Sequence, residues 1–138
     1  MRVFLDANIL FWAAYSDAAV RRLLKDLKSS SCSLAADRYV FEEALRNLTI
    51  QRSEAVPRLH ELMREVTIVP THISSSKIPP DVHLPEKDIP VLASAIEAGC
   101  DILMTGDSRH FCPLYGRSIE GLSIRSPVDT AKHILGYH

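Results

Sequence analysis

Four acidic residues at the edges of hydrophobic segments could together bind a divalent metal ion: Asp6, Glu43, Asp88 and Asp107. We call them the four acids. Carboxylate oxygens are the ligands that hard cations such as Mg²⁺ and Mn²⁺ prefer. Without a cation, several neighbouring carboxylates would repel one another, and some would take up protons. A bound cation can activate water and neutralise charge on a phosphoryl group, so the set suggests metal-assisted phosphoryl chemistry.

Each of the four acids also has a structural explanation when it is considered alone. Asp6, Asp88 and Asp107 could each cap a helix or a turn, a role that aspartate often takes. Glu43 could be a solvated helix residue like its neighbour Glu42. Because clustered acids mark functional sites only statistically, the metal-site hypothesis depends on all four side chains converging after folding.

The rest of the sequence predicts alternating strands and helices that could bring the four acids together. Strands are expected at residues 3–5, 32–35, 67–69, 102–104 and 122–124, the last of them as an edge strand. Helices are expected at residues 17–27, 37–48, 53–66 and 88–99, and from residue 126 onward. This order is typical of a parallel sheet with helices on both faces. Asp6 and Asp107 would then lie at carboxyl ends of strands, where such sheets place ligands.

Residues 70–87 differ from the rest of the chain because they are rich in Ser and Pro and contain few large apolar side chains. We expect a loop with little regular structure there. A loop of this length inside a small domain is often functional.

Length and composition predict one compact domain over residues 1–138 in the cytoplasm. The chain is 46% hydrophobic and 24% charged, as is ordinary for a globular protein. Asp6 and Asn8 interrupt the apolar N-terminal stretch, and no signal-peptide cleavage pattern follows it. No apolar run reaches the 18 or so residues that suggest a membrane span, so we expect no membrane association.

Charge and cysteine content narrow the classes of protein further. The formal net charge is −1, which is not the basic balance of a typical nucleic-acid binder. Setting aside the four acids leaves 13 Asp and Glu against 16 Lys and Arg, a balance that permits phosphate contacts. The three cysteines (Cys32, Cys100 and Cys112) are odd in number and form no CxxC pair, so we expect buried thiols rather than disulfides or a zinc site.

Four motifs, in this order along the chain, resemble those of the PIN-domain ribonucleases. Residues 5–10 (LDANIL) are similar to the family's opening motif, and residues 105–111 (TGDSRHF) to its late acidic motif. Residues 87–101 resemble the segment that carries the third acid. Residues 41–48 resemble the helix that carries the family's glutamate, and Glu43 fits that position better than Glu42. Any one motif is weak, but together they span nearly the whole chain.

The resemblance implies a PIN-like three-layer α/β fold with a central parallel sheet of about five strands flanked by helices. It also implies a metal-dependent endoribonuclease that acts on single-stranded RNA. Asp6, Asp88 and Asp107 would hold Mg²⁺ or Mn²⁺, and Glu43 would complete the catalytic set. Many single-domain members are VapC-type toxins that a cognate antitoxin restrains, and the family further suggests a homodimer.

Six other residues could support the site. Asn8, two residues after Asp6, could hold that carboxylate or a water, and by the same resemblance Thr105 would hydrogen-bond to a metal ligand. Four could face RNA phosphates: Arg109, His110, Arg21 and Lys25. Each also has an ordinary explanation, such as turn formation, strand propensity or a solvated basic surface. The aromatic side chains of Phe11, Trp12 and Tyr15 are expected to pack in a core or an interface, and an exposed part would suggest dimerisation.

Two other classes of function stay open from the sequence. The first is a catalytically silent PIN-like interaction module, in which the four acids only cap helices and a partner covers an apolar surface. The second is a phosphotransfer domain, because an aspartate at a strand end also serves there. The haloacid-dehalogenase pattern requires a second Asp at position 8, where this chain has Asn, so the phosphotransfer class ranks third.

Overall fold

The fold is built on a six-stranded sheet in which five neighbouring strands are parallel. A computed structural model describes residues 1–15 and 18–137, except for the side chains of residues 108, 109 and 112. The strands are β1 (Arg2–Leu5), β2 (Ser33–Ala36), β3 (Val66–Ile68), β4 (Ile102–Met104), β5 (Ser118–Ile119) and β6 (Leu122–Arg125). Their order in the sheet is β3-β2-β1-β4-β6-β5. All neighbours pair in parallel except β5 and β6, so the predicted α/β architecture is confirmed.

The prediction of an edge strand at residues 122–124 is wrong. β6 lies between β4 and β5, and the two-residue strand β5 forms the edge. Glu120 and Gly121 both have positive φ (52° and 83°) and fold β5 back onto β6 as a tight antiparallel turn. A strand of two residues is too short to show an alternating pattern, so the sequence gives no sign of it.

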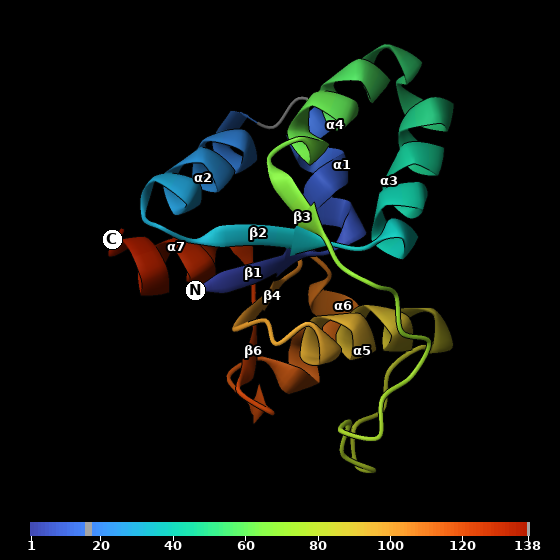
Figure 1. Cartoon of the computed structure of the whole chain (residues 1–138), viewed down its shortest axis with the longest axis vertical. Coiled ribbons are helices and arrows are strands. Elements are labelled where there is room, and N and C mark those ends of the chain that lie inside the picture. Colours follow the sequence, from blue (N-terminus) through green and yellow to red (C-terminus); the bar gives the residue numbers. More distant parts are fainter. Residues whose placement is uncertain (16–17, 138) are drawn as a thin grey trace.

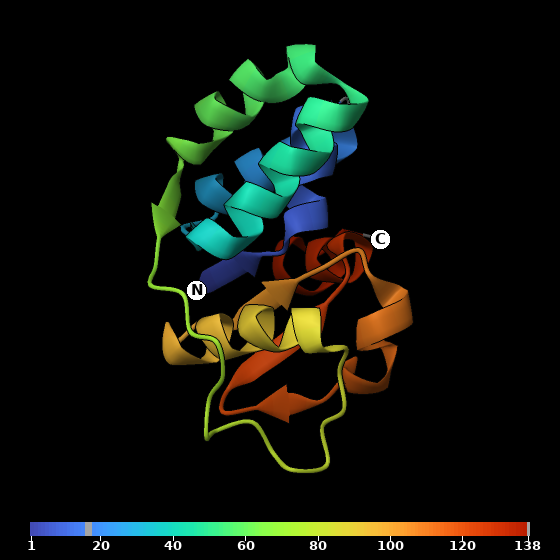
Figure 2. The ribbon, with the colours of Figure 1, turned by 90° about the vertical axis from the view of Figure 1, so that its right-hand side faces the viewer.

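Helices cover both faces of the sheet, so the molecule has three layers with the sheet in the middle. The α-helices in the described residues are α1 (Ala7–Tyr15), α2 (Ala18–Ser29), α3 (Arg38–Gln51), α4 (Val56–Met63), α5 (Ile89–Glu97), α6 (Ser108–Phe111) and α7 (Pro127–Leu135). Figures 1 and 2 show α1, α3 and α4 on one side of β1 and α5 and α6 on the other. None of the described helices combines the length and apolar character needed to cross a membrane.

The helix α1 has no counterpart among the predicted ranges. Its buried residues lie on several sides of the helix (Ala7, Ile9, Leu10, Ala13 and Ala14), because α2, α3 and α4 all pack against it. A helix that is apolar nearly all round lacks the polar face that makes helical periodicity visible in a sequence. The predicted start of the next helix, Asp17, lies outside the described residues.

Residues 70–85 have turns but no helix or strand, as expected, and the 3₁₀ helix η2 (Glu86–Asp88) then leads into α5. Cys32 and Cys100 are buried and free, also as expected. The side chain of Cys112 lies outside the described part of the chain.

Candidate metal centre

The pairing of β1 with β4 brings two of the acid-bearing segments together. The strands run in parallel with Leu5 opposite Met104, so both end at the same edge of the sheet. The backbone N–H of Asp6 continues this pairing by donating to the carbonyl oxygen of Met104 at 3.1 Å. Asp6 and the 105–107 turn therefore leave the sheet side by side, at the edge where parallel sheets place ligands.

All four acids line one pocket of about 230 Å³ at this edge. The lining residues are Asp6, Ala7, Asn8, Phe11, Glu43, Asn47, Gln51, Lys87, Asp88 and Asp107. The acids come from the end of β1, the middle of α3, the end of η2 and the turn after β4. Segments that are far apart in the sequence thus converge, as the metal-site hypothesis requires.

Asp6 is the most buried of the four acids, with 5% of its surface exposed. Burial raises the pKa of its carboxyl group from 3.8 to about 6. Hydrogen bonds from the Thr105 hydroxyl (2.7 Å) and the Ala7 N–H (2.7 Å) oppose this increase, and repulsion from Glu43 and Asp88 adds to it. The protein therefore holds Asp6 in place while making its negative charge unfavourable.

Thr105 connects both strand ends through its hydroxyl group. The hydroxyl donates to Asp6 and accepts from the backbone N–H of Asp107 at 3.0 Å and from the Asn8 amide at 3.4 Å. The Asn8 side-chain oxygen accepts from the Gly106 N–H at 2.9 Å. Asn8 is thus linked to Asp6 by way of the Thr105 hydroxyl, and its bond to Gly106 fixes the turn that carries Asp107.

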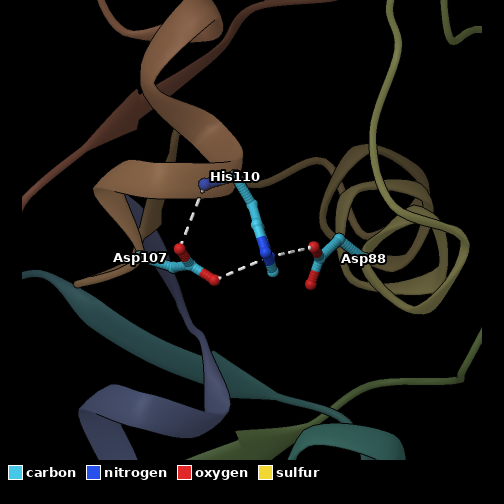
Figure 3. A group of neighbouring side chains, drawn as sticks. All are labelled: Asp88, Asp107 and His110. Carbon is cyan, nitrogen blue, oxygen red and sulfur yellow. Dashed lines mark hydrogen bonds and ion pairs between the residues drawn. The ribbon is translucent and has the colours of Figure 1, made fainter.

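His110 lies between Asp88 and Asp107 (Figure 3). Its Nδ1 atom is 2.7 Å from Oδ2 of Asp88 and 2.8 Å from Oδ2 of Asp107. Burial raises the pKa of Asp88, while nearby His110 and Lys87 lower it and Asp107 raises it further. One oxygen or nitrogen from each of Asp88, Asp107 and His110 lies within 4.8 Å of the others, so this group could hold a metal ion.

The donor set fits a divalent cation better than it fits helix capping. Asp107 does cap the short helix α6, because its Oδ1 accepts from the His110 N–H at 3.1 Å. The Asp88 side chain makes no capping bond to α5. The buried atoms Oδ2 of Asp88 and Nδ1 of His110 have no hydrogen-bond partner, although they face each other. Buried polar atoms without hydrogen bonds are costly unless another ligand satisfies them.

The structure separates Glu43 from its neighbour Glu42. Asp37 caps α3 by accepting from the Val40 N–H at 3.0 Å, which sets the start of the helix. Glu43 then lines the pocket. Glu42 instead pairs with Arg38 at 2.7 Å on the exposed side of α3. Glu43 is therefore the glutamate of this helix that shares the pocket with the aspartates.

Five lining residues are absent from the sequence-based site candidates: Ala7, Phe11, Asn47, Gln51 and Lys87. Asn47 and Gln51 follow Glu43 at intervals of four residues on α3, so they form a polar stripe on one helix face. That spacing is visible in the sequence and could have identified them once Glu43 was chosen. Lys87 adjoins Asp88 and adds a positive charge to the pocket.

The predicted RNA-contact residues are spread over the molecule. His110 was expected to face an RNA phosphate, and its side chain contacts Asp88 and Asp107. Arg21 donates to the Ala13 carbonyl oxygen at 3.1 Å, at the end of α1, and Lys25 is an exposed residue of α2. Neither lines the acidic pocket. The side chain of Arg109 lies outside the described residues, so these RNA contacts stay predictions.

Asp101 lies at the opposite edge of the sheet, as its position before β4 predicts. Its Oδ2 accepts from the backbone N–H of Arg2 at 2.7 Å, which ties the start of β1 to the start of β4. Asp101 is therefore a structural acid outside the pocket.

Solved structures share this fold. A chain in the VapBC2 structure from Rickettsia felis, bound to a DNA fragment from their promoter, aligns with 16% identity and a TM-score of 0.66 over 91% of this chain and 98% of that chain. Mycobacterium tuberculosis VapC20, a sarcin-ricin loop cleaving toxin, aligns with 12% identity and a TM-score of 0.55 over 78% and 91%. A chain in the VapBC-1 structure from nontypeable Haemophilus influenzae aligns with 11% identity and a TM-score of 0.60, over 93% of this chain and 99% of that chain.

No protein-family model matches the chain, and a sequence search among curated proteins finds no match. The likeness therefore concerns the three-dimensional arrangement. The chain has a PIN-like fold, as the motif resemblance implied. Its sheet differs from the expected parallel sheet of about five strands because the short antiparallel strand β5 adds a sixth.

Proposed function

We propose that this protein is a metal-dependent endoribonuclease that hydrolyses phosphodiester bonds in single-stranded RNA. The observation that carries the proposal is the convergence of the four acids in one pocket at the carboxyl edge of the sheet. Asp6, Asp88 and Asp107 would hold Mg²⁺ or Mn²⁺, with Glu43 completing the catalytic set. The cation, when bound, would supply an activated water and neutralise charge on the phosphoryl group.

The surrounding residues have roles that follow from their contacts. Thr105 and Asn8 hold Asp6 and the 105–107 turn in one geometry. Lys87 offers a positive charge beside the acids, which suits an RNA phosphate. Asn47 and Gln51 line the same wall of the pocket and could donate to phosphate or ribose oxygens. The pocket therefore combines metal ligands with groups that bind the nucleic-acid backbone.

RNA is the proposed substrate because of the motif resemblance and because a chain with the same fold, VapC20, is a sarcin-ricin loop cleaving toxin. We further propose that the protein is the toxin of a toxin–antitoxin pair and forms a homodimer. Structurally similar chains have been solved as VapBC and FitAB complexes.

An apolar groove supports the idea of a protein partner. The groove has a volume of about 710 Å³, and its apolar side chains come from α1, α2, the segment before β5, and α7: Trp12, Val20, Leu23, Tyr115, Val128 and Ala131. Trp12 is 38% exposed, which is unusual for such a large apolar side chain. Co-purification with the product of a short upstream reading frame would test the pair, and sedimentation would test the dimer.

Cleavage of a 5′-labelled single-stranded RNA tests the proposed activity. We expect cleavage with Mn²⁺ or Mg²⁺, none with EDTA, and none by Asp6→Asn, whose fold should be intact by circular dichroism. An Asp6→Asn variant that cleaves as fast as the parent would contradict the proposal.

The second candidate is a catalytically silent PIN-like interaction module, which the apolar groove favours. The two candidates differ in their response to Mn²⁺. A melting temperature that does not move with Mn²⁺, together with no cleavage of any RNA tested, would support the silent module.

A further inference from the structure

We infer that Nδ1 of His110 is itself a ligand of the metal ion, so that the site is a mixed carboxylate and imidazole site that selects Mn²⁺ over Mg²⁺. This inference rests on the proposed function, because it concerns the same pocket. It adds a ligand to the oxygen-only set that the four acids provide, and it predicts which cation the site prefers.

The spacing of three atoms is the first observation. Nδ1 of His110 is 2.7 Å from Oδ2 of Asp88 and 2.8 Å from Oδ2 of Asp107. Neighbouring ligands of an octahedral cation with bonds of about 2.1 Å lie roughly 3 Å apart. Both nitrogen–oxygen separations are therefore close to those that one shared cation would impose, and ligand atoms of the two aspartates lie within 4.8 Å of each other.

The proton count is the second observation. A neutral imidazole carries at most one proton on Nδ1, yet this atom faces two carboxylate oxygens. Nδ1 and Oδ2 of Asp88 are both buried and neither makes a hydrogen bond of acceptable geometry. Asp88 is itself 8% exposed, so little solvent can compensate. Three electron-rich atoms thus point at one another with too few protons between them, which a cation would resolve.

The start of α6, which carries His110, is held by Asp107. Oδ1 of Asp107 accepts from the His110 N–H at 3.1 Å, so one carboxylate oxygen holds the first turn of α6. Its other oxygen, Oδ2, faces Nδ1 of the side chain three residues on. Figure 3 shows the ring between the two carboxylates, with Nδ1 toward both. Asp107 therefore sets the backbone position of His110 through one carboxylate oxygen and faces its imidazole with the other.

An imidazole ligand changes which cation the site favours. Mg²⁺ binds almost entirely through oxygen and water, whereas imidazole nitrogen suits transition metals. The alternative is that His110 competes with the cation. In that case its positively charged side chain would neutralise the acids and would be displaced when a cation binds. The two roles predict opposite effects of removing the imidazole. Loss of a ligand weakens Mn²⁺ binding, whereas loss of a competitor strengthens it.

Electron spin echo spectroscopy of the Mn²⁺-loaded full chain tests the inference directly. We expect ¹⁴N modulation from a coordinated imidazole in the unmodified protein, and its loss in His110→Gln. The matched control is His133→Gln, because His133 is an exposed residue of α7 and should leave the signal unchanged. By calorimetry, His110→Gln should weaken Mn²⁺ binding about 10-fold or more and change Mg²⁺ binding much less.

A second variant covers the case in which His110→Gln does not fold. His110→Asp keeps a ligand at the position, so it should bind Mn²⁺ without ¹⁴N modulation and shift the preference toward Mg²⁺. Mn²⁺ binding without ¹⁴N modulation in the unmodified protein, or tighter Mn²⁺ binding by His110→Gln, would overturn the role of His110 and leave the nuclease proposal standing. Absence of any Mn²⁺ binding would overturn both.

Discussion

The carboxylates of the pocket and those of the outer surface differ in how many positively charged partners the protein gives them. On the surface, Asp81 pairs with Arg117 (2.9 and 3.1 Å), Glu65 with Lys28 (2.7 Å) and Asp129 with Arg125 (3.0 Å). In the pocket, Lys87 is the one basic lining side chain among the described residues, and Asp88 and Asp107 share a single imidazole, that of His110. Surface acids have partners from the protein, whereas the pocket acids lack enough of them.

This difference also appears in the proton affinities. Hydrogen bonds and ion pairs lower the pKa of Asp81 and Glu65, as is usual for a paired surface carboxylate. Burial instead raises the pKa of Asp6 and Asp88. Surface pairs of this kind contribute little to stability. Asp6 and Asp88 therefore oppose folding when they are ionised, which indicates that they are kept for binding rather than for stability.

The largest predicted effect compares an acid of the pocket with an acid of the opposite sheet edge. Asp88→Asn should slow RNA cleavage about 100-fold or more, because even the partners of metal ligands are worth 10–100-fold. Asp101→Asn should cleave at the parental rate, since Asp101 bonds to Arg2 outside the pocket. Initial rates on one labelled RNA check both. Equal losses in the two variants would remove the distinction between pocket and structural acids.

The second prediction concerns stability without metal. The pKa of Asp6 rises from 3.8 to about 6 on folding, so the folded state binds more protons than the unfolded state between those values. Stability should therefore fall as pH rises from about 4 to 6. Asp6→Asn removes the charge and should raise the free energy of unfolding at pH 7.5 by up to about 3 kcal/mol, at 1.36 kcal/mol per pKa unit.

Urea denaturation in EDTA measures this gain, and the same experiment at pH 4 is its control. The gain should disappear at pH 4, where Asp6 is largely protonated in the folded state. An Asp6→Asn variant that is less stable than the parent at pH 7.5 would show that the charge of Asp6 is well balanced by the protein.

The third prediction compares two buried threonines. Thr105→Val removes the hydroxyl that donates to Asp6 and accepts from Asp107, so Mn²⁺ affinity should fall about 10–100-fold. Thr130→Val removes an equally buried hydroxyl, which donates to the Ser126 carbonyl oxygen at 2.8 Å in α7. It should lose about 1 kcal/mol of stability with unchanged Mn²⁺ affinity. Calorimetric titration distinguishes the two, and matching losses of affinity would argue against a specific role for Thr105.

The fourth and smallest prediction joins the pocket to the apolar groove. A Cβ atom added at Gly106 would collide with the far end of the Trp12 ring, which is 38% exposed and can shift, so Gly106→Ala should cost only about 1 kcal/mol of stability. In a Trp12→Ala background the same substitution should cost almost nothing, because the colliding ring is gone. A double-mutant cycle in urea measures the coupling. A full cost in both backgrounds would place the strain elsewhere than at Trp12.

Much of the fold is predictable because the motifs lie on elements with clear patterns. The strands at residues 3–5 and 102–104 are short apolar runs, and their parallel pairing follows from the alternation with helices. The helix α1 was not predicted because it is apolar on nearly all sides. The edge position of β5 depends on a turn at Gly121 that only the structure reveals.

The candidate site divides in the same way. The residue types and order of the four acids predict a shared site, and the structure places them in one pocket. The position of His110 between Asp88 and Asp107 was not predicted, because it depends on how η2 and α6 approach each other across the sheet edge. Spacing along the chain holds no information on that approach. Glu43 differs from Glu42 only through the rotation of α3, which Asp37 and the helix packing set.

Anomalous diffraction from crystals grown with Mn²⁺ tests the central claim most directly. The claim is that the four acids converge to bind one divalent cation. It predicts an anomalous peak within bonding distance of Asp88 and Asp107 in the pocket. The claim would be contradicted if the protein cleaves RNA only with Mn²⁺ but its crystals show the anomalous peak elsewhere and none in this pocket.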